Sequence, residues 1–155
     1  MKLEERLQDR TQWTTAGRCP VERAMGLVGS RNAMLAMREA FYGTTRFDDF
    51  AERVGMSPAT TSSNLKALTE AGLLERRPYR EAGTRTRDEY VLTEAGVDLM
   101  PVVLALFAWG SRHAGETPGV DVVHAGCGEA VEVRATCAGG HQLESDDVEL
   151  RVRSR

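Results

Sequence analysis

The chain has 155 residues, 41% of them hydrophobic and 28% charged, and its formal net charge is −3. These values are typical of a soluble globular protein with one real core and room for an appendage. No stretch approaches the roughly 20 apolar residues that a membrane span needs, and the charged N-terminus lacks the apolar run of a secretory signal. With thiols that suggest no disulfide framework, these features predict a cytoplasmic protein without a membrane partner.

Composition and turn signals divide the chain into three regions. Residues 1–18 are expected to form a polar arm, residues 19–113 a mainly helical domain, and residues 114–155 an acidic appendage. Alternating valines in the appendage predict short strands. The domain is expected to open with helices near 20–28 and 31–42.

Two short amphipathic helices joined by a tight turn are predicted next. Apolar residues recur from Phe47 to Val54 at i, i+3, i+4 and i+7, which gives one apolar stripe on a helix. Gly55 can end this helix in the left-handed conformation. Ser57 can cap a second helix, and Pro58 is tolerated at its first position because no donor is needed there.

The second helix has an outer face of small and polar residues. A helix that enters the DNA major groove needs small polar side chains on its outer face, because bulky apolar groups would keep it away from the base edges. We therefore expect Thr60, Ser63 and Asn64 to face base edges. Ser57 and Lys66 are expected to contact phosphates.

A β-hairpin with a basic tip follows this helix. Residues 73–79 and 88–92 are the strand candidates, and Gly83 marks the bend between them. From Ser57 to Arg87 there are six Lys or Arg and three Glu, a local excess of three positive charges on a chain of negative net charge. Such a surface favours phosphate contact, although any single arginine could be ordinary solvated surface. The hairpin residues expected at phosphates are Arg80, Arg85 and Arg87.

Two helices followed by such a hairpin are typical of a winged helix-turn-helix, which binds DNA through its second helix. The predicted fold class is mostly α with a small β-hairpin wing, followed by a short β-rich C-terminal appendage. Such a protein needs no cofactor for DNA binding.

The residues in this order also resemble a known family. CPVERAMGLVGS, RFDDFAERVGMS, SPATTSSNLKALTEAGLLERR and YVLTEAGVDLMPVVLALFAWGSRH are similar to the HxlR-type winged-helix transcriptional regulators, relatives of the MarR group, over roughly residues 19–113. The resemblance implies a homodimer built mainly from N-terminal and C-terminal helices. The chain departs from the family pattern at Ser30-Arg31-Asn32, where Gly-Lys-Trp is usual, and at Thr61, where a core Leu is usual. Both departures could loosen packing locally.

A long apolar helix is predicted from Thr93, which can cap it, to about His113. Apolar residues cover two of its sides, and one small domain can bury only one of them. The other side most simply meets a second copy of the chain, and the alternative is that the appendage folds over it. Pro101 should bend this helix or delay its start. A two-fold dimer would place two recognition helices about 34 Å apart and predicts an inverted-repeat operator.

The appendage carries two thiols and two imidazoles in close pairs. His124 and Cys127 are separated by two residues, and Cys137 and His141 by three. Thiolate and imidazole are ligands that tetrahedral Zn²⁺ selects, so these four residues are a candidate zinc site. The alternative is a degenerate zinc-ribbon-like element in which the cysteines are packing residues or form a disulfide.

Cys19 stands before Pro20 at the start of a helix, with Arg18 and Arg23 close in sequence. The helix dipole and these cations favour the reactive thiolate. Several HxlR-type regulators resemble this arrangement and sense oxidants or electrophiles there, whereas the alternative is an inert buried cysteine. Two other inputs stay open: a metal in the appendage, or a small apolar ligand near Met25, Met34, Met37 and Phe107.

An enzyme is the less favoured class. The sequence shows no Gly-rich phosphate loop, no His/Ser/Asp grouping and no paired carboxylates on a recognisable scaffold, and its histidines are all late, at 113, 124 and 141. The stronger rival to a DNA-binding regulator is a winged-helix protein-interaction or metal-handling adaptor. Such modules keep the fold while they lose the basic wing.

Overall fold

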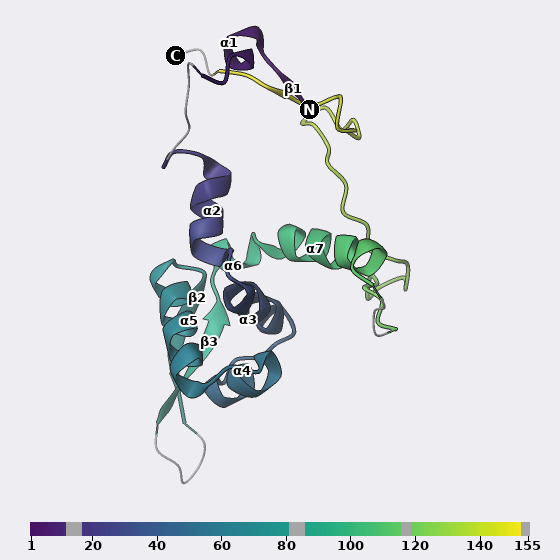
Figure 1. Ribbon diagram of the computed structural model, residues 1–155. Helices are drawn as coiled ribbons and strands as arrows, with labels where there is room; N and C mark the ends of the chain where they lie inside the picture. The colour runs from purple at the N-terminus through teal and green to yellow at the C-terminus, as the bar shows by residue number, and fades with distance from the viewer. Residues whose placement is uncertain (12–16, 81–85, 116–118, 153–155) are drawn as a thin grey trace. The chain divides into compact units, whose positions relative to one another are not determined.

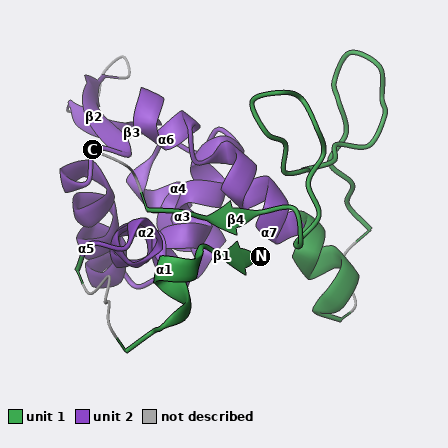
Figure 2. Cartoon of the chain, turned by 90° about the horizontal axis from the view of Figure 1, so that it is seen from above, with its two compact units in different colours: residues 1–17, 108–155 green, residues 18–107 purple. Residues whose placement is uncertain are grey.

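The computed structural model describes residues 1–11, 17–80, 86–115 and 119–152. It divides into two compact units, residues 18–107 and residues 1–17 with 108–155, which Figure 2 shows in purple and green. The sequence placed the corresponding boundaries after residues 18 and 113.

The unit of residues 18–107 is mostly helical with one small antiparallel hairpin, so the predicted fold class is confirmed (Figure 1). We call the hairpin the wing; its strands β2 and β3 pair from Leu74 with Leu92 to Tyr79 with Arg87. The helix α7 begins in this unit and ends in the other. In chain order the elements are α2 (Pro20–Val28), α3 (Arg31–Phe41), α4 (Phe47–Val54), α5 (Pro58–Glu70), β2 (Leu74–Tyr79), β3 (Arg87–Leu92), α6 (Glu94–Val97) and α7 (Met100–His113).

The ends of the helices follow the local sequence signals. Gly55 ends α4 with a φ of 72° in the left-handed region, where a residue without Cβ meets no steric penalty. The Ser57 hydroxyl accepts from the backbone N–H of Thr60 at 3.2 Å and so caps α5. Ser30 caps α3 by accepting from Ala33 N–H at 3.1 Å, so the departure from the family pattern at residues 30–32 supplies a helix cap.

The core of this unit lies between α3, α4, α5 and β2. Phe50 and Leu65 are fully buried there, and Phe50 meets the ring of Tyr90 edge to face at a centroid distance of 6.4 Å. Thr61 is also fully buried, and its hydroxyl donates to Ser57 O at 3.0 Å, so this polar group in the core is satisfied. Met37 is fully buried in the same cluster, which makes it a packing residue.

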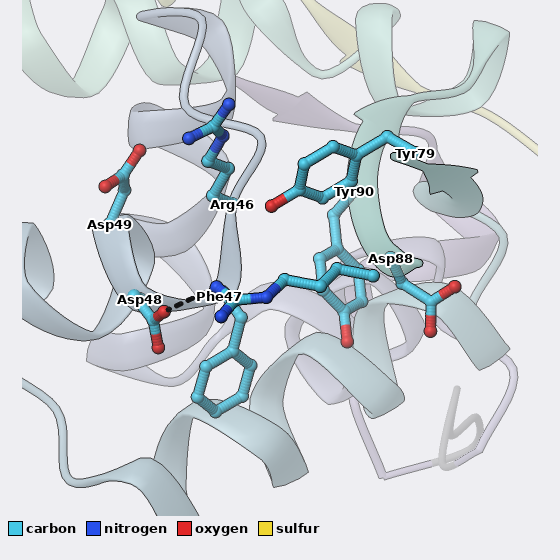
Figure 3. A pocket seen from close by; sticks show the side chains of 8 residues that line it. Arg46, Phe47, Asp48, Asp49, Tyr79, Asp88 and Tyr90 are labelled. Atoms are coloured by element: carbon cyan, nitrogen blue, oxygen red, sulfur yellow. Dashed lines mark ion pairs between the residues drawn. The ribbon is translucent and has the colours of Figure 1, made fainter. Parts of the chain in front are cut away.

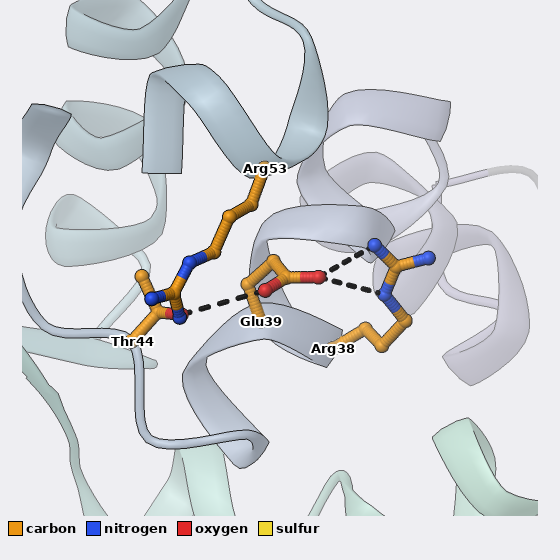
Figure 4. Close-up of polar contacts among 4 residues, drawn as sticks. All are labelled: Arg38, Glu39, Thr44 and Arg53. Atoms are coloured by element: carbon orange, nitrogen blue, oxygen red, sulfur yellow. Dashed lines mark hydrogen bonds and ion pairs between the residues drawn. The ribbon is translucent and has the colours of Figure 1, made fainter. Parts of the chain in front are cut away.

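A buried carboxylate links α3 to α4 (Figure 4). Glu39 is 6% exposed, and its Oε1 accepts from Arg38 Nε at 3.1 Å and Nη2 at 2.6 Å. Its Oε2 lies 3.4 Å from the hydroxyl of Thr44, which in turn accepts from Arg53 Nη1 at 2.7 Å. Since Arg53 belongs to the last turn of α4, this network fixes the loop that positions α4 against α3.

The single long helix predicted after Thr93 is two helices. Thr93 does cap the first, because its hydroxyl accepts from Gly96 N–H at 3.0 Å, but α6 ends at Val97 and α7 begins at Met100. Pro101 is the second residue of α7, where its missing N–H costs no hydrogen bond, so the delayed start occurs.

Residues Glu94–His113 correct one expectation from the sequence. This stretch of 20 residues is long and apolar enough to cross a membrane by length and composition, so the expectation that no segment approaches a span is wrong. The core helix of a soluble protein can have the same length and composition. In α7, which is described throughout, no side chain is fully buried, and Val102, Leu106 and Trp109 are 47%, 49% and 58% exposed.

The second unit has little regular structure. It contains β1 (Lys2–Leu3), α1 (Glu5–Gln8) and β4 (Glu149–Leu150), and β1 pairs with β4 in parallel. The other strands expected from alternating valines are reduced to the isolated bridges Val123–Ala130 and Thr136–Gln142. Alternating valines favour a strand, but a longer ladder also requires a neighbouring strand with which to pair.

Candidate nucleic-acid interface

The outer face of α5 is narrow, polar and exposed. Thr61, Leu65 and Leu68 are buried on the inner face. At about 100° per residue, Ser63 and Lys66 lie nearly opposite these three, and both are exposed. The structure therefore presents a ridge without bulky apolar groups, centred on Ser63.

Thr60 and Asn64 lie on the flank of this ridge and are half-buried. The Asn64 side-chain amide donates to Thr60 O at 2.9 Å, and the Ser63 hydroxyl donates to the same carbonyl at 3.0 Å. The Ser63 hydroxyl hydrogen and one N–H of the Asn64 amide are thus used within the helix. The Asn64 amide also has a second N–H and an oxygen, which are the groups that could pair with a base.

The cations of this surface form ion pairs with neighbouring carboxylates. Lys66 Nζ lies 3.7 Å from Glu70, one helical turn away, and Arg87 lies 3.8 Å from Asp48 on α4. On the wing, Arg76 pairs with Asp88 across the two strands. The hydrogen bond and the charge of Asp88 raise the pKa of Arg76 above its usual value, so this guanidinium stays charged. Of the other predicted wing contacts, Arg80 is exposed and Arg85 lies outside the described residues.

A cavity of about 580 Å³ lies between the start of α4 and the wing (Figure 3). Arg46, directly before α4, lies over the ring of Tyr79 at 5.2 Å and forms an isolated bridge with Glu89. Sequence reasoning missed Arg46, since its place beside the wing depends on pairing between segments distant in sequence. The lining mixes both signs of charge with aromatic rings: Arg46, Phe47, Asp48, Asp49, Tyr79, Arg87, Asp88 and Tyr90.

Cys19 lies at the start of α2, as the sequence predicted. It is the N-cap residue, half-buried, and in the described chain its thiol makes no side-chain capping bond. Val21, Met25 and Leu27 on the following helix are 69%, 58% and 52% exposed. Exposed apolar side chains therefore lie on the helix that begins at this thiol.

The candidate zinc ligands come together as two pairs. His124 Nδ1 lies 3.1 Å from Cys127 Sγ, and His141 Nδ1 lies 3.4 Å from Cys137 Sγ. Within the described ranges, no group of three or more His, Cys, Asp or Glu side chains is arranged to hold a metal ion. The four residues are not one site in this conformation.

Comparison with known proteins decides the family. A family model described as an HxlR-like helix-turn-helix matches residues 27–118. This chain belongs to the HxlR-like helix-turn-helix family. An uncharacterized HTH-type transcriptional regulator of Mycobacterium tuberculosis is 41% identical to this HxlR-like protein over 119 residues, which cover 76% of this chain and 74% of the relative.

Solved structures of related proteins agree with this assignment. A crystal structure of PA1607, described as a candidate transcription factor, has a TM-score of 0.78 and 28% identity and covers 91% of this chain and 98% of its own. The redox regulator HypR in its reduced form has a TM-score of 0.56 and 26% identity, and covers 62% of this chain and 94% of its own. This HxlR-like protein is therefore a transcriptional regulator of the helix-turn-helix type, and its family points away from an enzyme.

Proposed function

We propose that this HxlR-like protein is a cytoplasmic homodimer that binds an inverted-repeat operator in double-stranded DNA with sequence specificity. One observation carries the proposal: the ridge of α5 around Ser63 is exposed, polar and free of bulky apolar side chains, beside a wing that bears Arg76, Arg77 and Arg87. A polar ridge without bulky apolar groups can enter the major groove, and cations beside it can contact the flanking phosphates.

The contacts divide into two kinds. Thr60, Ser63 and Asn64 are proposed to face base edges, and Asn64 is the strongest reader because an amide can pair with adenine through two hydrogen bonds. A second set of residues is proposed to contact DNA phosphates. Such contacts fix the position of the protein on the duplex but do not distinguish one base sequence from another. These residues are Ser57, Lys66, Arg80, Arg85 and Arg87.

Dimerisation is supported by two exposed apolar faces in the described chain. On α7, Val102, Leu106 and Trp109 follow each other at i, i+4 and i+7 and are each about half exposed. On α2, Val21 and Met25 are 69% and 58% exposed. A monomer rarely leaves such large side chains in water, whereas a two-fold contact buries the same patch on both copies.

Substitutions on α5 and the wing test the two kinds of contact separately. Asn64→Ala should weaken the specific complex by about 1–3 kcal/mol and leave non-specific binding unchanged. Arg87→Ala should weaken binding to all sequences and reduce the slope of log affinity against log salt by about one unit. Fluorescence anisotropy titrations over a salt series measure both quantities.

Matched controls lie outside the proposed interface. Asn32→Ala removes a half-buried amide from α3, and Arg112→Ala removes an exposed guanidinium from the last turn of α7. Both should bind DNA like the wild type. If Asn64→Ala and Arg87→Ala also behave like the wild type, the assigned face of α5 and the wing is wrong.

The proposed signal is oxidation or electrophile modification of Cys19. Its half-buried thiol lies at the start of α2, the helix whose exposed Val21 and Met25 are proposed to meet the second copy, so an adduct would add bulk at one end of that contact. HypR, solved in reduced and oxidized forms, shows that a protein of this fold can be a redox regulator.

Cys19→Ser tests this signal. Mild oxidant should weaken operator binding by wild type about 5–150-fold, the usual range of coupling between two sites, and should leave Cys19→Ser unaffected. An equal loss of operator binding in both proteins would assign the response to Cys127 or Cys137. No loss of binding in either protein would indicate a small-molecule ligand as the signal.

A further inference from the structure

Two turns of the appendage have the same construction. In the first, Gly128 N–H and Cys127 N–H both donate to His124 O, at 2.8 and 3.3 Å, and the bridge between Val123 and Ala130 closes the turn. In the second, Cys137 N–H donates to His141 O at 3.0 Å, and the bridge between Thr136 and Gln142 closes the turn. Each turn thus has a short antiparallel bridge at its base and a His/Cys pair at its tip.

Glycines make both turns suitable for this pairing. Gly128 and Gly140 have φ of 78° and 81°, a backbone conformation that side chains disfavour. At Gly126, an added Cβ would lie 2.8 Å from Cε1 of His124, so the imidazole occupies the space left by a missing side chain. The backbone therefore holds each imidazole close to its thiol.

The distance between sulfur and nitrogen in each pair is close to the distance between two ligand atoms of a tetrahedral zinc site. Bonds of about 2.3 Å to sulfur and about 2.0–2.1 Å to nitrogen, at the tetrahedral angle, place the two ligand atoms about 3.6 Å apart. The observed Sγ–Nδ1 distances are 3.1 and 3.4 Å. A small opening of each turn would admit the ion.

One pair provides only two ligands, while zinc takes four. The turns are joined by the nine residues 128–136, and closure of a loop this short is a small cost beside four metal–ligand bonds. Two thiolates balance the charge of Zn²⁺, and their protons pass to the solvent. His124, Cys127 and His141 are exposed and Cys137 is half-buried, so an ion can reach all four.

We infer that residues 123–142 form a structural zinc site that is completed on binding, in which one ion joins the His124–Cys127 pair to the Cys137–His141 pair. The ion draws the two turns together and orders the segment between them. Because four protein ligands close the coordination sphere, the site supplies structure and no open position for catalysis.

The test uses the full chain, stripped of metal by a chelator under reducing conditions and then titrated with Zn²⁺ against a chromophoric chelator. We expect one zinc per chain. Replacement of a residue that only supports a ligand usually costs about 10–100-fold in metal affinity, so Cys127→Ser and Cys137→Ser should each lose more than about 100-fold. Cys19→Ser is the matched control and should bind zinc like the wild type. Zinc should also slow amide hydrogen exchange in residues 123–142.

Three outcomes would overturn the inference. The wild type could bind no more zinc than a Cys127→Ser/Cys137→Ser double variant. One of the two single substitutions could leave the affinity unchanged, which would mean an isolated two-ligand pair. One zinc per two chains would mean an ion shared between copies. None of these measurements involves DNA, so their failure and the failure of the proposed function are separate results.

Discussion

Leu106→Glu is expected to convert the proposed homodimer to a monomer at micromolar concentration. Leu106 is 49% exposed at the centre of the α7 stripe, so roughly half of its apolar surface remains to be buried in a two-fold contact. Burial of a whole Leu side chain is worth about 1.5–3 kcal/mol, and a two-fold interface counts each loss twice. An unpaired carboxylate within the contact adds a further cost. We therefore expect the dimer dissociation constant to rise by at least about 100-fold in sedimentation equilibrium.

Ser111→Glu is the matched control for this experiment. It adds the same charge to the same helix on the side opposite Val102, Leu106 and Trp109, where Ser111 is exposed. This variant should remain dimeric. An unchanged dissociation constant for Leu106→Glu, with helix content retained, would move the interface away from this stripe.

Arg38→Ala is expected to destabilise the helical unit by about 3 kcal/mol, near the lower end of the range for a broken buried ion pair. Arg38 is the cation that contacts Glu39 in the structure, and the Glu39 side chain is 7% exposed. Its removal takes away the cation that contacts this buried carboxylate directly and leaves Arg53, which reaches Glu39 through the Thr44 hydroxyl. Chemical denaturation at one fixed protein concentration measures the loss, since the stability of a dimer depends on concentration.

A double variant separates the charge effect from lost packing. Glu39→Met in the Arg38→Ala background removes the uncompensated carboxylate and should recover part of the loss. Arg112→Ala, which removes a surface guanidinium bonded to Ala108 O, should change stability by less than about 0.5 kcal/mol. If the double variant is less stable than Arg38→Ala, the buried charge is not the cause.

The features predicted correctly from the sequence are those determined by local chemistry. Gly55 ends α4, and Ser57 and Thr93 cap α5 and α6, because each forms bonds within a few residues of itself. The apolar spacing that predicted α4 also describes its buried face, which contains Phe50 and Val54. Such signals depend little on the rest of the fold.

The features that the sequence did not reveal depend on pairing between distant segments. Arg87 meets Asp48, and Arg46 lies over Tyr79, because the wing folds beside the start of α4. Arg87 is proposed to contact a phosphate, and the carboxylate of Asp48 would lie beside that contact. In the described part of the valine-rich appendage, the expected strands are limited to β4 and isolated bridges for the same reason, because alternation does not specify a partner strand.

Selection of bound sequences from a random pool of double-stranded DNA tests the central claim most directly. The account predicts one enriched motif, an inverted repeat with half-site centres about one helical turn apart, roughly 10–10.5 base pairs. Enrichment should disappear for a variant in which the wing residues Arg76, Arg77 and Arg87 are replaced by Glu. Recovery of no motif by the folded, dimeric wild type, or of the same motif by this charge-reversed variant, would contradict the proposal of a sequence-specific DNA-binding regulator.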